Sequence, residues 1–127
     1  MTGRGHQDIF AGDIEWMQGQ EPGVAYARFR LDETNPRTPT VILSKFEPGV
    51  RVPPHTHDTN YFEYIIEGEQ TVGKTKFGKG DVRLATGGTG YGPIVVGPEG
   101  CTVLTVFTDG SQSMTVPMPR QKAAVEA

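Results

Sequence analysis

Short stretches of β-branched and aromatic residues recur along the chain, and clusters of glycine and proline separate them. Most stretches have about four to eight residues, as β-strands do, and they are rich in Val, Ile, Thr, Phe and Tyr. Apart from the Ala-rich segment 120–127, no window repeats apolar residues at the helical period of about 3.6. The pattern predicts an all-β sandwich or barrel. The predicted strands cover residues 24–31, 40–46, 51–53, 61–67, 69–72, 74–77, 82–84, 91–96 and 102–108.

Glycine and proline mark the expected chain reversals. Gly68 and Gly80 each stand between two polar residues, where glycine supplies the positive φ of a tight turn at little steric cost. The segment 97–100 (Gly-Pro-Glu-Gly) predicts a turn between the last two strands. Because proline donates nothing to a sheet ladder, residues 53–54 predict a strand end that places His55 beside a loop mouth.

With 127 residues, the chain has the length of one domain. We divide it into an N-terminal arm (1–22), a single β-barrel domain (23–117) and a C-terminal tail (118–127). The arm is too short to fold alone, and pairing it with a sheet edge of a second copy would cover its apolar residues. We therefore expect a homodimer. The apolar residues of the arm are Ile9, Phe10, Ile14, Trp16 and Met17.

Charge and cysteine content limit the expected classes of binding partner and the expected cellular compartment. Lys and Arg number 12, Asp and Glu number 15, and the net charge is −3 with no basic cluster. Nucleic acid and anionic membrane surfaces both require clustered positive charge, so neither is an expected partner. No segment approaches the roughly 20 apolar residues of a membrane span. Cys101 has no second cysteine to pair with, and the N-terminus lacks a secretion signal, so we expect a cytoplasmic protein.

The triplet His55-Thr56-His57 is the most informative chemistry in the chain. In an extended strand, residues two apart point to the same side, so both imidazoles can converge on one metal ion. Imidazole suits Fe, Mn, Ni, Cu and Zn. Taken alone, such a pair is more often two partly exposed polar histidines at a strand end.

The surroundings of the triplet resemble the first motif of the cupin superfamily, in which a glycine precedes H-x-H by five residues. Gly49, His55 and His57 reproduce that spacing, Gly68 matches the closing glycine, and residues 80–91 resemble the second motif. The resemblance spans about residues 40–108. It implies a double-stranded β-helix (a jelly-roll), an antiparallel two-sheet barrel with a site at one open end. It also implies a dimer.

Two of the four usual metal-ligand positions depart from that pattern. The family glutamate falls on Tyr61, and the histidine of the second motif falls on Tyr91, so only His55 and His57 remain. The tyrosines have two interpretations. They fill the barrel as aromatic side chains, or they donate hydrogen bonds that orient a substrate or stabilise an oxyanion.

Glu63 is a possible substitute ligand. Strand alternation places it on the same inward side as Tyr61. An unpaired ionised carboxylate is costly to bury, so Glu63 needs a metal, a raised pKa or a cation. It is then a metal ligand, a catalytic base, or the partner of an arginine such as Arg28, Arg30 or Arg83.

Two functions follow from these residues. The first is an enzyme whose divalent transition metal (Fe, Mn, Ni or Zn) is held by His55, His57 and Glu63, with Glu63, Tyr61 and Tyr91 as catalytic groups. Such a site suits lyase, isomerase, cyclase or dioxygenase chemistry on a small organic molecule. The alternative is a metal-free module that binds a small, partly apolar molecule in the barrel. Pairing of Glu63 with an arginine in the wall would favour this alternative.

Overall fold

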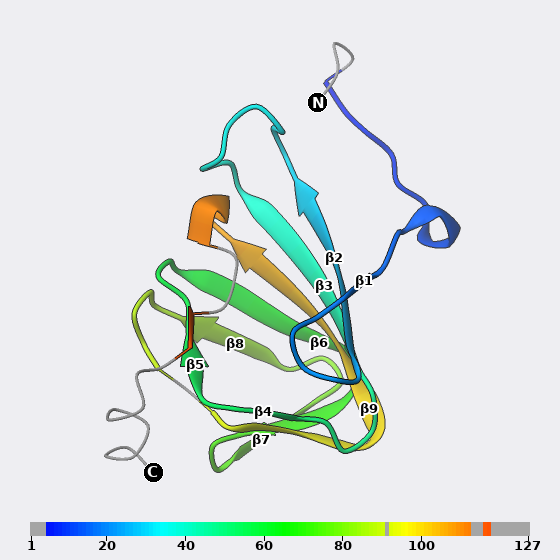
Figure 1. Ribbon diagram of the computed structural model, residues 1–127, viewed down its shortest axis with the longest axis vertical. Helices are drawn as coiled ribbons and strands as arrows, with labels where there is room; N and C mark the ends of the chain where they lie inside the picture. The colour runs from blue at the N-terminus through cyan, green and yellow to red at the C-terminus, as the bar shows by residue number, and fades with distance from the viewer. Residues whose placement is uncertain (1–4, 91, 113–115, 118–127) are drawn as a thin grey trace.

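The computed structural model describes residues 5–90, 92–112 and 116–117 (Figure 1). Tyr91 and the predicted tail 118–127 lie outside the described residues. The predicted all-β class is confirmed, since apart from strands the described residues form only two short 3-10 turns. The elements are η1 (Ala11–Asp13), β1 (Met17–Gln18), β2 (Val24–Arg30), β3 (Thr40–Phe46), β4 (Arg51–Val52), β5 (His55–Thr56), β6 (Tyr61–Val72), β7 (Thr75–Gly78), β8 (Val82–Ala85), β9 (Ile94–Phe107), η2 (Gly110–Gln112) and β10 (Val116–Pro117).

The strands form an antiparallel barrel of two sheets, as the sequence predicts. The main sheet has the order β1-β2-β3-β9-β6, and β8 pairs with the first residues of β6. The second sheet of the barrel consists of β4, the start of β9, the end of β6, and β7, and its hydrogen bonding is continuous with the main sheet. β5 pairs separately with β10 in a two-stranded sheet. Figure 1 shows β2, β3, β9, β6 and β8 running side by side, with β4 and β7 below them. The long strands β6 and β9 therefore belong to both sheets and join them.

The turns predicted at Gly68 and at residues 97–100 are wrong. β6 runs through the first position and β9 through the second, and the register between these strands shifts there. Gly68 has φ +79°, and a Cβ atom on it would collide with the carbonyl oxygen of Gly100. The glycine thus allows a close approach in a bulge, which bends the strands from one sheet into the other. The turn predicted at Gly80, with φ +89°, lies between β7 and β8 and is confirmed.

Alternation along β6 sets the interior of the barrel. Tyr61, Glu63 and Ile65 are buried, whereas Phe62 and Tyr64 face outward. Ile65 belongs to an apolar cluster with the start of β9, and Tyr61 belongs to a second cluster with β3 and the end of β9. The interior therefore combines apolar packing with buried polar side chains, and these polar side chains lie at one end of it.

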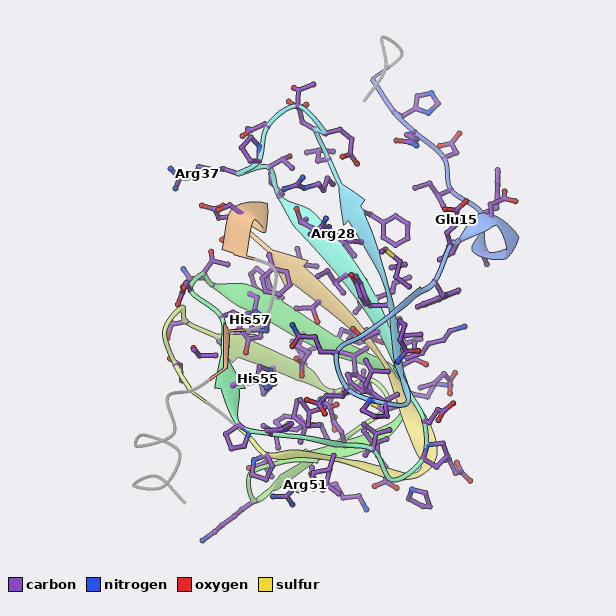
Figure 2. All side chains as sticks on the ribbon, in the orientation of Figure 1. Glu15, Arg28, Arg37, Arg51, His55 and His57 are labelled. Atoms are coloured by element: carbon purple, nitrogen blue, oxygen red, sulfur yellow. The ribbon has the colours of Figure 1, made fainter. Side chains whose placement is uncertain are left out.

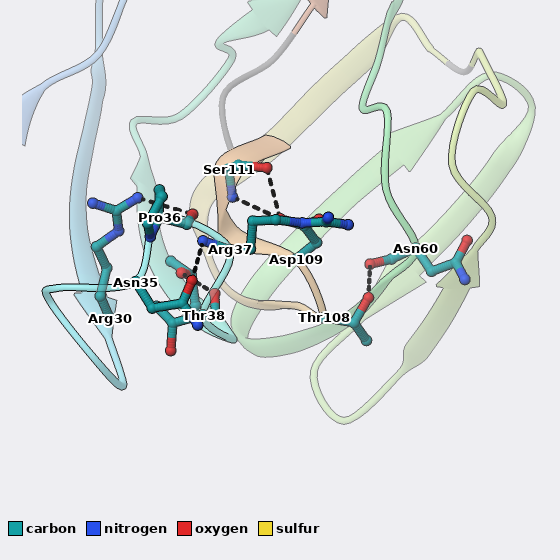
Figure 3. Close-up of polar contacts among 10 residues, drawn as sticks. Arg30, Asn35, Pro36, Arg37, Thr38, Asn60, Thr108, Asp109 and Ser111 are labelled. Carbon is teal, nitrogen blue, oxygen red and sulfur yellow. Dashed lines mark hydrogen bonds and ion pairs between the residues drawn. The ribbon is translucent and has the colours of Figure 1, made fainter.

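Polar contacts fix the loops at that end of the barrel (Figure 3). Arg37 Nε donates to Asp109 Oδ2 at 2.9 Å, which ties the β2–β3 loop to the end of β9. Ser111 donates to Asp109 Oδ1 from its backbone nitrogen at 3.0 Å and from its hydroxyl at 2.6 Å. Thr108 Oγ1 donates to the carbonyl oxygen of Asn60 at 3.4 Å. These bonds hold the segment that leads into β6.

The described part of the arm pairs with its own chain. Met17 and Gln18 form β1, which lies antiparallel to β2, and the ammonium group of Lys45 lies 4.2 Å from the centroid of the Trp16 ring. The β2 edge of the main sheet is thus covered in part by β1. Within the described residues, no helix is long and apolar enough to cross a bilayer.

Candidate functional site

A cavity of about 230 Å³ lies between the sheets, and the segment that carries the two histidines forms part of its wall. Its walls are mainly apolar side chains of β2, β3, β4 and β9, and its polar groups include two imidazoles, two carboxylates, an amide and hydroxyls. The lining residues are Gly19, Gln20, Glu21, Val24, Tyr26, Ile42, Ser44, Phe46, Val52, Pro53, Pro54, His55, His57, Glu63, Thr105 and Phe107.

The local sequence places His55 and His57 at the mouth of the barrel. β4 ends at Val52, residues 53–54 interrupt the ladder, and the chain resumes as β5 at His55. Both rings are buried and project from the β5 segment towards the interior (Figure 2). Their centroids lie 5.5 Å apart in an edge-to-face arrangement. The two rings are therefore neighbours on the same side of this segment, as strand alternation predicts.

Burial keeps the His55 ring neutral. Desolvation lowers its pKa below the ordinary value of 6.5 and is the largest effect. The hydrogen bond to Pro53 raises the pKa and the positive charge of Arg83 lowers it, and the net shift is downward. His55 Nδ1 lies 3.1 Å from the Pro53 carbonyl oxygen. Because a carbonyl only accepts, Nδ1 carries the proton of the neutral ring. His55 thus adds no positive charge to the cavity at neutral pH.

Aromatic packing holds His57 in place. Its ring centroid lies 5.0 Å from that of Tyr61, in a T-shaped pair, and 4.9 Å from that of Phe107. Tyr61 and Phe107 are themselves in contact, with centroids 5.4 Å apart. Tyr61, predicted to line the site, therefore packs inside the barrel against a site histidine.

Glu63 is paired with an arginine, one of the three roles considered from sequence. Arg83 lies directly opposite it across β6 and β8, and its Nη2 and Nε donate to the two carboxylate oxygens at 3.1 and 3.4 Å. Gln70 Nε2 donates to Glu63 Oε1 at 3.0 Å. Arg83 Nη2 also donates to the Tyr61 hydroxyl at 3.4 Å. The carboxylate charge is thus compensated by the wall of the barrel.

A comparison with family models identifies the family of this chain. The model described as the ChrR cupin-like domain matches residues 6–109. The chain belongs to this cupin family. The cupin resemblance carried by Gly49, His55, His57 and Gly68 is confirmed at the level of the superfamily. A search of curated proteins found no significant match.

Solved structures agree on the fold. KdgF from Halomonas sp. has a TM-score of 0.62 and 21% identity, over 80% of this chain and 94% of that one. The polyketide cyclase RemF from Streptomyces resistomycificus has a TM-score of 0.69 and 19% identity, over 95% and 92% of the two chains. Oxalate decarboxylase from Bacillus subtilis has a TM-score of 0.68 and 21% identity, over 95% of this chain and 37% of that one. The double-stranded β-helix is confirmed.

The described residues of this cupin do not form a complete metal site. Among them, no group of three or more His, Cys, Asp or Glu side chains is placed to hold a metal ion. His55 and His57 offer two imidazoles, but the carboxylate of Glu63 binds Arg83 and Gln70 instead. Catalytic zinc sites, for comparison, usually have three protein ligands. The donor set therefore does not fit a metal held by these side chains alone.

Several residues of the site were not identified from the sequence, and only one of them follows from strand alternation. Thr105 alternates with buried Val103 and Phe107 on β9, so its inward direction follows from the pattern. Gln70 is different, because two register shifts in β6 separate it from Glu63 and interrupt the alternation. Residues 19–21 line the cavity although they lie in the predicted arm, and no local pattern indicates that contact.

Proposed function

We propose that this cupin binds a small, uncharged and largely apolar organic molecule in the cavity beside His55 and His57. The observation that carries the proposal is the pairing of Glu63 with Arg83, which compensates the charge of the buried lining carboxylate. The second lining carboxylate, Glu21, is only partly buried and adds no attraction for an anion. Apolar walls with a few polar groups at one end are typical of sites for small organic ligands.

The electrostatics of the site favour an uncharged ligand. The His55 ring is neutral, the cavity lining contains no Lys or Arg among the described residues, and Arg83 behind Glu63 is engaged with that carboxylate. An anion entering the cavity would lose its hydration shell without meeting an unpaired cation there, which is costly. A hydroxyl or carbonyl group meets polar partners instead, including the imidazoles and the hydroxyl of Thr105.

Matched pairs of probe molecules test this proposal. Phenol and cyclohexanol, compared with benzoate and cyclohexanecarboxylate, differ mainly in charge, and binding is followed by NMR shifts of the histidine rings. We expect the alcohols to bind at least about tenfold more tightly than the carboxylates. Tighter binding of the carboxylates would contradict the proposal.

A pair of neighbouring variants shows where the probes bind. Val52 lines the cavity, whereas Arg51, the preceding residue of β4, is exposed. Val52→Trp should fill part of the cavity and abolish the phenol shifts, and Arg51→Trp should leave them unchanged. Equal effects of the two substitutions would place phenol outside the cavity.

The second candidate function is metal-dependent catalysis. His55 Nδ1 donates to a backbone carbonyl, as metal-binding histidines commonly do with their second nitrogen, and two neighbours carry the names polyketide cyclase and oxalate decarboxylase. Because the described side chains offer only two imidazoles, a divalent Fe, Mn, Ni or Zn ion would need a further ligand besides His55 and His57. Elemental analysis of untagged protein purified without chelators separates the functions. Stoichiometric metal that is lost in both His55→Ala and His57→Ala would support the second function over the first.

A further inference from the structure

The outer side of the main sheet, opposite the cavity, carries an apolar patch. Phe62 and Tyr64 on β6 are 51% and 42% exposed, and Val82 and Leu84 on β8 are 57% and 69% exposed. Phe62 lies opposite Leu84, and Tyr64 lies opposite Val82, so the four side chains share one side of two adjacent strands. The patch continues over β9, where two half-buried residues pair with β6. We define the apolar patch as Phe62, Tyr64, Val82, Leu84, Leu104 and Val106.

The polarity of residues 62–64 on β6 and 82–84 on β8 is inverted with respect to an ordinary solvated sheet. An antiparallel strand with one side in water normally turns its polar residues outward. Here Glu63 and Arg83 face inward, while the residues on either side of each face outward and are apolar. The ligand cavity lies on the other side of the sheet and does not use the patch. Exposed apolar patches of several hundred Å² commonly mark a protein interface.

We propose that the apolar patch docks against the same patch of a second copy of this chain. The patch contains no charged side chain, so it has no charge that would attract an oppositely charged partner. For the same reason, two copies of the patch can face each other without electrostatic repulsion. A two-fold interface requires only that one surface be complementary to itself. Two sheets pack face to face in this way in β-sandwiches.

The area is sufficient for a specific dimer. Scaled by their exposed fractions, the four residues of β6 and β8 offer about 350 Å² of apolar surface per copy. Non-obligate interfaces are about 55–65% apolar, so the two copies would together bury about 1,100 Å². This lies above the roughly 1,000 Å² expected of a biological interface. The arm does not compete for the patch, because β1 pairs with β2 at the far edge of the sheet.

Light scattering of the full chain at micromolar concentration tests the proposal. We expect a mass of twice 13.8 kDa for the wild type, and at least a tenfold weaker dimer for Phe62→Glu and Leu84→Glu, since charges at the centre of an interface are strongly unfavourable. Leu31, on the β2–β3 loop, is 56% exposed and lies off the patch, so Leu31→Glu is the matched control and should remain dimeric.

Three outcomes would overturn the proposal: a monomeric wild type, a dimer that survives both patch variants, or a dimer broken by Phe10→Glu in the arm but not by Leu84→Glu. Far-ultraviolet circular dichroism identifies a variant that fails to fold. The milder Leu84→Ser then takes its place, and it too must weaken the dimer. Phenol binding by these variants is expected to match the wild type, so this test is separate from that of the proposed ligand site.

Discussion

The Glu63→Gln substitution removes one charge from an ion pair that is almost enclosed. The side chains of Glu63 and Arg83 are only 8% and 15% exposed. Glutamine has nearly the same volume and keeps one carbonyl oxygen, so Gln70 retains an acceptor. Arg83 keeps its charge, however, and loses its counter-charge.

The structure sets the size of the expected loss. Removing one partner of a buried ion pair typically costs about 3–5 kcal/mol of unfolding free energy. The oxygen that glutamine keeps and the partial exposure of Arg83 reduce this to about 2–3 kcal/mol. For a domain of this length, each kcal/mol shifts Tm by about 3–5 °C, so Tm should fall by about 10 °C.

A double-mutant cycle measured by urea denaturation is the assay. Glu63→Gln and Arg83→Met are compared with the double variant, which should recover to within about 1 kcal/mol of the wild type because neither unpaired charge remains. Additive single effects would refute the argument that the pair is coupled. A fully stable Glu63→Gln protein that loses bound metal would refute it as well, and would make Glu63 a ligand.

Three further predictions concern single residues. The pKa of His55 is lowered in the folded protein, so the unfolded chain binds the extra proton first. The contribution of neutral His55 to the unfolding free energy should therefore be fully present above pH 6.5 and be lost as the pH falls below it. Thermal unfolding measured across pH should show a smaller loss for His55→Gln than for the wild type. Burial raises the pKa of Cys101 to about 11, so a disulfide reagent should modify the folded protein slowly at pH 7 and the urea-unfolded protein rapidly; equal rates would contradict this. Gly68→Ala should destabilise the protein far more than Gly80→Ala in urea denaturation, since both have positive φ but only the Cβ at position 68 meets a backbone carbonyl.

Local patterns predict much of this fold, because each strand carries its own signal. β3 has the predicted bounds, and the alternation of β6 correctly turns Glu63 inward. The error at Gly68 arises because positive φ suits a turn and a bulge equally, and only the approach of Gly100 from another strand distinguishes them.

For a similar reason, the sequence could not decide whether Glu63 is a metal ligand, a catalytic base or the partner of an arginine. It depends on the register of β8 against β6, which places Arg83 opposite the carboxylate. The two strands are 18 to 24 residues apart along the chain at their paired positions, beyond the reach of alternation within either strand. For the same reason, no pattern in the arm indicates that residues 19–21 line the cavity.

The inverted polarity of β6 and β8 connects the ligand site to the proposed dimer. Placing Glu63 and Arg83 inside the barrel neutralises the wall of the cavity, but it leaves β8 with only Ala85 as a partly buried apolar residue on that side. Polar pairs contribute little net stability even when their geometry is good, whereas buried apolar surface contributes about 25 cal/mol per Å². The outer residues Phe62 and Leu84 can supply that burial only if something covers them. A second copy covering the patch would therefore stabilise the strands that carry the polar network of the site, and stability would rise with protein concentration.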